Sequence, residues 1–220
     1  MWVIYIHFAL VLLPLVLWSV KYKDLGMDLR ILGFAMAITL LVEGYAAYLV
    51  FQLTRNLYLY HLLIPIQYTL FSLVIYQALE GITARKTVLV SIPLYLLIVL
   101  LITLHLQTTT EFNSYARLMK NALLACWTLL YYREVFKGLR VIRLDREPMF
   151  WISTGLFFYS LGSFFVDGLM NYLLGLSYEI AHTLYYISVF LGYMLYITFL
   201  IAFVLCCKYP NDARVKSAPS

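Results

Sequence analysis

The chain has 220 residues, of which 64% are hydrophobic and only 12% are charged. A typical soluble domain has about 25% charged residues, so this composition excludes an ordinary water-soluble domain and predicts an integral membrane protein. The net charge of +5 is explained by basic connectors at one membrane surface, so nucleic acid is not an expected partner.

Seven apolar blocks alternate with short polar connectors along the chain. A bilayer core about 30 Å thick requires roughly 20 apolar residues per spanning helix, and strands of a barrel would instead alternate apolar and polar residues. The blocks therefore predict an all-α, polytopic transmembrane bundle. We expect spans at residues 2–20, 31–53, 58–79, 88–106, 115–136, 149–174 and 180–207, followed by a short cytoplasmic tail at 208–220.

The basic residues gather in alternate connectors. Thirteen of the sixteen Lys and Arg residues lie in the first, third and fifth connectors with their flanks, or in the tail. Basic residues of short connectors are retained on the cytoplasmic side of the membrane. The asymmetry predicts an odd number of spans, with the N-terminus outside and the C-terminus in the cytoplasm.

Glu43, near the middle of the second span, is the clearest ionisable residue inside the expected membrane region. A charged side chain there is costly unless it is paired or hydrated, so it is a candidate functional residue. No basic residue lies within two turns of it on the same helix. Two interpretations are open: a proton carrier, or a hydrogen bond to a neighbouring helix that only fixes the packing.

Further polar residues follow in the third, fifth and sixth spans. Gln67 lies near mid-depth, and Asp167 and Asn171 share one helix face because they are four residues apart. Lys120 and Arg117 lie near the outer end of the fifth span. Their simplest interpretation is that their long side chains reach out to the outer headgroups.

Four histidines, His7, His61, His105 and His182, fall in the outer half of this topology. Apart from Glu179, three residues before His182, no His, Cys or carboxylate lies three or four residues from any of them, so the sequence holds no local metal motif. We expect no metal and no cofactor.

These polar residues suggest one binding site if their helix faces converge. The outer half would then enclose a polar cavity for a small molecule, an ion or a lipid headgroup. The candidate ligand-binding or proton-carrying residues are His7, Glu43, His61, Gln67, Lys120, Asp167, Asn171 and His182.

The fifth connector and its flanks interleave basic and apolar residues, a pattern typical of an interfacial amphipathic segment. Contact with anionic lipid is one interpretation, because each basic residue near the leaflet contributes about 1 kcal/mol of attraction. The alternative is a docking surface for a cytoplasmic or membrane protein partner. The basic residues concerned are Arg133, Lys137, Arg140, Arg143 and Arg146.

Two segments carry a resemblance. Residues 56–68 read Asn-Leu-Tyr-Leu-Tyr-His-Leu-Leu-Ile-Pro-Ile-Gln-Tyr, and residues 146–159 read Arg-Glu-Pro-Met-Phe-Trp-Ile-Ser-Thr-Gly-Leu-Phe-Phe-Tyr. Both resemble a group of small uncharacterised bacterial seven-helix proteins. The resemblance implies seven helices in the bacterial inner (plasma) membrane, and it implies no activity and no site residues.

The function predicted first is a receptor-like or sensory module that binds a ligand in the outer half and signals to a separate partner. A small proton-coupled transporter centred on Glu43 and Asp167 is the alternative. An intramembrane lipid-modifying enzyme and a scaffold subunit are also open, although no nucleophile elbow or phosphate-binding glycine loop supports an enzyme.

Overall fold

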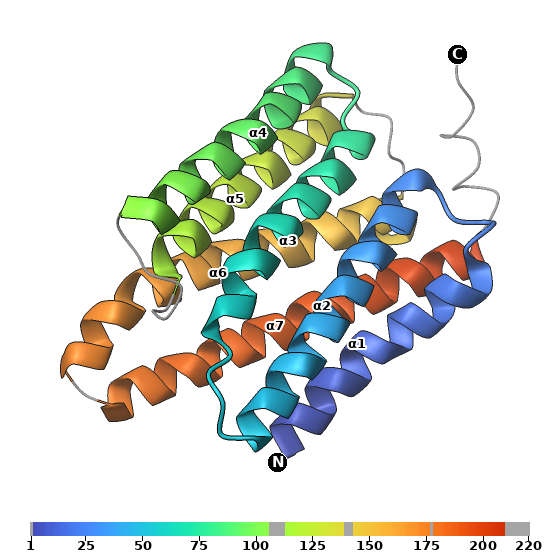
Figure 1. The fold of residues 1–220 in the computed structure, drawn as a ribbon. Helices are drawn as coiled ribbons and strands as arrows, with labels where there is room; N and C mark the ends of the chain where they lie inside the picture. The colour runs from blue at the N-terminus through green and yellow to red at the C-terminus, as the bar shows by residue number, and fades with distance from the viewer. Residues whose placement is uncertain (1, 106–112, 139–142, 177, 210–220) are drawn as a thin grey trace.

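The computed structural model describes residues 2–105, 113–138, 143–176 and 178–209 (Figure 1), without the side chains of 2–4, 170–176, 178, 180 and 181. The described residues form helices and no strands, which confirms the expected all-α class. The elements are α1 (Trp2–Lys21), α2 (Met27–Phe51), α3 (Leu57–Ala78), α4 (Ile82–His105), α5 (Ser114–Gly138), the short 3-10 helix η1 (Leu144–Arg146), α6 (Pro148–Leu176) and α7 (Tyr178–Lys208).

Five of these helices are long and apolar enough to cross a bilayer, which makes the chain an integral membrane protein. They are α2, α3, α4 and the segments Pro148–Leu169 and His182–Lys208 of α6 and α7. In α1 the part with described side chains is the shorter apolar helix Tyr5–Lys21. Helix α5 has five charged residues and is not among the five.

Helix α4 starts at Ile82, six residues before the first residue of the expected span at 88. The reason is that basic residues end an apolar run without ending a helix. Arg85 lies over the ring of Tyr76, 4.4 Å from its centroid. The carboxylate of Glu134 accepts the backbone N–H groups of Glu80 at 2.8 Å and Gly81 at 3.2 Å, so α5 holds the connector that precedes α4.

Six helices form a closed ring. In the order α1, α2, α3, α5, α6, α7 and back to α1, each helix packs against the next, whereas α4 packs only against α3 and α5 among the substantial helix contacts. Figure 1 shows consecutive helices running in opposite directions, with α4 on the outer side of α3 and α5. Short connectors favour this antiparallel arrangement of neighbours.

The alternation places the first residues of α1 and the last residues of α7 at opposite ends of the bundle (Figure 1). The connectors α1–α2, α3–α4 and α5–α6 share the end where α7 finishes. Basic residues occupy it, for example Lys21, Arg85, Lys137 and Lys208. We call it the basic end, and the other end the N-terminal end.

Large side chains fill the ring towards the basic end. Phe199 and Phe203 of α7 pack there with Ile152 and Leu156 of α6, and all four are fully buried. Nearer the middle, the Tyr68 hydroxyl is 2.7 Å from Ser91 Oγ of α4, and it accepts the indole N–H of Trp127 at 3.3 Å. The cavity described below lies in the other half of the ring.

Candidate functional site

A cavity of about 620 Å³ lies inside the ring, in the half nearest the N-terminal end. This volume falls within the range of small-molecule sites, about 300–1,000 Å³. All six ring helices contribute to its lining, and no α4 residue does. The polar or ionisable lining residues are His7, Glu43, Asn56, Tyr60, Gln67, Asn113, Arg117, Tyr159, Asp167, Tyr185, Ser188 and Tyr196.

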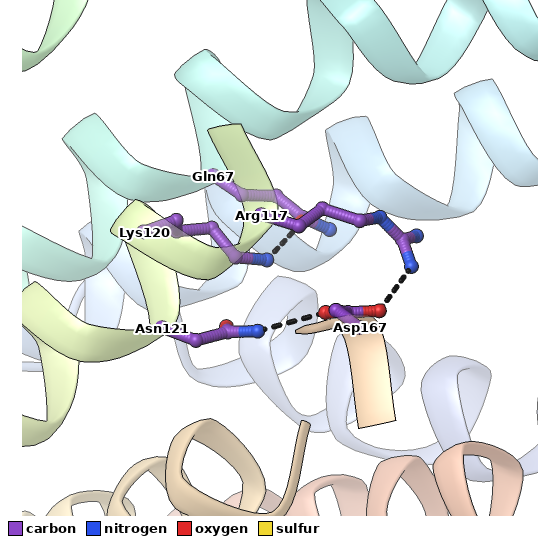
Figure 2. A network of polar contacts seen from close by, with 5 residues as sticks. All are labelled: Gln67, Arg117, Lys120, Asn121 and Asp167. Carbon is purple, nitrogen blue, oxygen red and sulfur yellow. Dashed lines mark hydrogen bonds and ion pairs between the residues drawn. The ribbon is translucent and has the colours of Figure 1, made fainter. Parts of the chain in front are cut away.

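Asp167 of α6 is the centre of a network on one side of the cavity (Figure 2). It is only 4% exposed. Its carboxylate accepts hydrogen bonds from Arg117 Nη1 at 3.1 Å and from Asn121 Nδ2 at 2.9 Å. Arg117 and Asn121 are four residues apart, so they share one face of α5. We call this side, α5 with Asp167, the α5–α6 wall.

Lys120 takes part in a second chain of hydrogen bonds. Its ammonium donates to Gln67 Oε1 at 3.2 Å, and Gln67 Nε2 donates to Thr39 Oγ1 at 3.1 Å, which links α5, α3 and α2. The ammonium also lies 5.8 Å from the centroid of the Tyr159 ring. Figure 2 shows the Lys120 and Gln67 side chains converging between their helices.

The expectation that Lys120 and Arg117 reach out to headgroups is wrong. Lys120 is 3% exposed and Arg117 has a side chain that is 27% exposed and paired with Asp167. Both residues lie on the face of α5 that looks into the ring, where Gln67 and Asp167 offer acceptors. A long basic side chain extends to the headgroups when the interior of the bundle offers no hydrogen-bond acceptor within its reach.

His7 and Glu43 form the polar contact of the opposite side. His7 Nε2 lies 2.6 Å from Glu43 Oε2 and connects α1 with α2. The His7 ring also packs edge-on against Tyr196 of α7, with centroids 5.3 Å apart. The pair therefore joins three neighbouring helices at the cavity.

The structure brings His7, Glu43, Gln67 and Asp167 together in the cavity lining, but not every candidate. Lys120 is not a lining residue, and it is connected to the cavity through its hydrogen bond to Gln67. His61 is not a lining residue, and His182 is exposed and packs against Tyr186 at 4.9 Å. Asn171 belongs to α6, and its side chain lies outside the described residues.

The basic residues of the inner face are spread over several elements. Arg133 and Lys137 lie in the last turns of α5, and Arg143 directly precedes η1. Arg146 lies 4.7 Å from the centroid of the Tyr209 ring, so it contacts the residue after α7. Arg140 lies outside the described residues.

The lining residues that were not candidates from the sequence include Asn113, Tyr60 and Tyr196. Neutral and aromatic residues are common in any apolar helix, so none of them stands out alone. A signal exists for Tyr60, because it is seven residues before Gln67 and the two share one face of α3.

The described residues hold no group of three or more His, Cys, Asp or Glu side chains that could bind a metal ion. The cavity lining provides hydrogen-bond donors, the two carboxylates of Glu43 and Asp167, and aromatic side chains. Comparison of the chain with protein-family models, curated proteins and solved structures gave no match.

Proposed function

We propose that the chain crosses the membrane seven times, with its N-terminus outside and its C-terminus in the cytoplasm of a bacterial cell. Two observations support the two additional spans. Helices α1 and α5 complete the ring with the apolar helices, and α5 directs its charges Arg117 and Lys120 inward rather than at lipid. The grouping of basic residues at one end supports the orientation.

Labelling with a membrane-impermeant maleimide tests this topology. In a background without Cys126, Cys206 and Cys207, the variant Leu53→Cys places a thiol in the α2–α3 connector, at a residue that is 97% exposed. The matched variant Lys86→Cys places a thiol near the basic end. Intact cells should label the first and not the second, and the reverse pattern would refute the orientation.

We propose further that the protein is a receptor-like module that binds a small molecule in the cavity from the outer side. The observation that carries this function is the enclosure of the cavity by six helices, with charged or polar side chains from all of them. A site of this size, partly apolar and with a few convergent polar groups, is the common form of a ligand site.

The long helices α6 and α7 give such a site a route to the basic end. Helix α7 has 31 residues and extends from Tyr185 at the cavity to Lys208 at the basic end. Helix α6 has 29 residues and extends from Pro148 at the basic end past Asp167. A rigid shift of either helix on ligand binding would therefore move residues that face a cytoplasmic partner.

A glycine on the cavity wall provides a sharp test. A Cβ added at Gly192 meets no atom within 4 Å, and Gly192 lines the cavity, so Gly192→Leu should fill space without breaking the fold. Gly44 of α2 has the same open surroundings and is not a lining residue, so Gly44→Leu is the matched control.

The measurement is native mass spectrometry of the purified variants. A small molecule should remain bound to the natural protein and to Gly44→Leu, and its occupancy should fall at least ten-fold in Gly192→Leu. Hydrogen exchange at the ends of α6 and α7 nearest the basic end should change when this molecule is released. Equal occupancy in all three proteins would overturn the cavity as the binding site.

A proton-coupled transporter is the second candidate, favoured by the His7–Glu43 contact at 2.6 Å. A histidine and a carboxylate that share a hydrogen bond between two helices can exchange a proton as the helices move. Proteoliposomes with an imposed proton gradient separate the candidates. Uptake of the co-purifying molecule that is lost in Glu43→Gln supports transport, and a receptor gives no uptake.

A further inference from the structure

The α5–α6 wall has one more positive charge than negative charge. Arg117 and Lys120 face a single carboxylate, that of Asp167, which is already hydrogen bonded to Arg117 and Asn121. Glu43, the second carboxylate at the cavity, is bonded to His7 on the other side. Within the described part of the chain, no carboxylate lies within salt-bridge distance of the Lys120 ammonium.

Buried hydrogen-bond donors on the same wall also lack acceptors. The Lys120 ammonium has three donors, and Gln67 Oε1 is its one hydrogen-bond acceptor among the described residues. Asn113, which is 4% exposed and lines the cavity, has an Nδ2 group with no hydrogen-bond partner among them. Burying a donor without an acceptor is unfavourable, so this wall is complementary to a group that supplies acceptors and negative charge.

The spacing along α5 concentrates these donors. Asn113, Arg117 and Lys120 are separated by four and three residues, so their side chains lie on one helix face. They occupy the residue before α5 and its first two turns, where the helix dipole adds to the positive potential. A planar carboxylate matches an Arg fork with neighbouring N–H donors. A single negative charge also balances the single excess positive charge.

The rest of the cavity is mostly apolar and aromatic. Ile64 and Phe71 of α3 and Val189 and Tyr196 of α7 line it. These side chains offer contact to an apolar or aromatic group, and they offer no compensation for a second charge.

We infer that the ligand is an organic monocarboxylic acid, with its carboxylate on the lining residues Asn113 and Arg117 of the α5–α6 wall and its apolar body against α3 and α7. The Lys120 charge, which is hydrogen bonded to the lining residue Gln67, adds to the attraction without lining the cavity itself. This inference rests on the proposed binding function and names its ligand class. The acid enters either as a free aromatic acid or as a membrane fatty acid, since both present the same carboxylate on an apolar body.

Isothermal titration of the full-length protein in nanodiscs tests the ligand class. The probes are 3-phenylpropionate, its neutral amide, the amine 3-phenylpropylamine, and palmitate. At least one carboxylate should bind ten-fold or more tightly than the amide and the amine. Preference for 3-phenylpropionate identifies a free acid as the source, and preference for palmitate identifies membrane fatty acid.

Two variants that each replace a lysine by a neutral glutamine locate the carboxylate. Lys120→Gln keeps a donor for Gln67 and removes the excess charge, so affinity for the acid should fall about ten- to a hundred-fold while affinity for the amide is unchanged. Lys86→Gln removes an exposed charge near the basic end and should leave both affinities unchanged. Thermal unfolding shows that each variant is folded.

The outcomes are distinct. If the amide or the amine binds as well as the acids, or if Lys120→Gln keeps the preference for acid, the acid class is refuted while small-molecule binding stands. If no probe binds, the acid class is refuted, and native mass spectrometry of Gly192→Leu then decides separately whether the cavity binds another molecule.

Discussion

Replacing Asp167 by Asn tests whether the α5–α6 wall holds the bundle together. The substitution keeps the size of the side chain but removes the negative charge that faces Arg117 and Lys120. Removing one partner of a buried ion pair typically destabilises a protein by about 3–5 kcal/mol. The Arg117 side chain is 27% exposed, so its charge stays partly solvated after its partner is lost. We therefore expect the free energy of unfolding to fall by about 2–4 kcal/mol.

The assay is a double-mutant cycle on the free energy of unfolding, measured by titration with SDS in mixed micelles and followed by circular dichroism. In Asp167→Asn with Arg117→Gln, both charges of the pair are absent. The double variant should be more stable than the sum of the two single effects predicts, by about 1–3 kcal/mol. A single variant within about 0.5 kcal/mol of the natural protein, or strictly additive effects, would show that the ion pair does not stabilise the bundle.

Three further substitutions probe the packing that surrounds the cavity. Tyr68→Phe removes the hydroxyl that accepts from Trp127, and it should lower the free energy of unfolding by about 1–3 kcal/mol; an unchanged value in the same SDS titration would contradict this. Gly155→Leu adds a side chain whose Cβ would overlap Thr198 Oγ1 of α7, so α6 and α7 must separate. We expect the free energy of unfolding to fall by about 1–3 kcal/mol, while Gly44→Leu should cause a much smaller loss. Glu134→Gln weakens the acceptor for the backbone N–H groups before α4 and should lower the local stability of the start of α4 by about 0.5–2 kcal/mol. Hydrogen exchange in the first turn of α4 should then be faster. Exchange equal to that of the natural protein would refute the capping role.

The sequence was sufficient for the class of fold. Hydrocarbon offers no partner for backbone N–H and C=O groups, so long apolar segments must become helices that satisfy their own hydrogen bonds. The approximate ends of most helices followed for the same reason, because polar connectors interrupt the apolar runs. The largest difference is at α4, where Arg85 and Lys86 lie in the first two turns of the helix and precede the apolar run.

The candidate site could be predicted only in part. Glu43, Gln67 and Asp167 stand out because a polar residue in an apolar run is rare, and the structure places all three at one cavity. Asn113 and Tyr196 gave no comparable signal, since such residues are also common at helix ends and in packed cores. Lys120 was wrongly predicted to reach the outer headgroups. The sequence gives its position along the helix, but not the side of the helix that faces the interior of the bundle.

The sequence by itself determined that hydrocarbon surrounds most of the chain, because its long segments are apolar. It also determined the approximate depth of each residue in the bilayer, because depth follows from position along the helix. Only the tertiary structure decided which helix faces which: that α4 stands outside the ring, that His7 meets Glu43, and that Lys120 turns to Gln67. The physical reason is that these helices are apolar on nearly all sides, so burial in hydrocarbon fixes depth but hardly distinguishes one rotation about the helix axis from another. Close packing and a few polar contacts between neighbours settle that rotation.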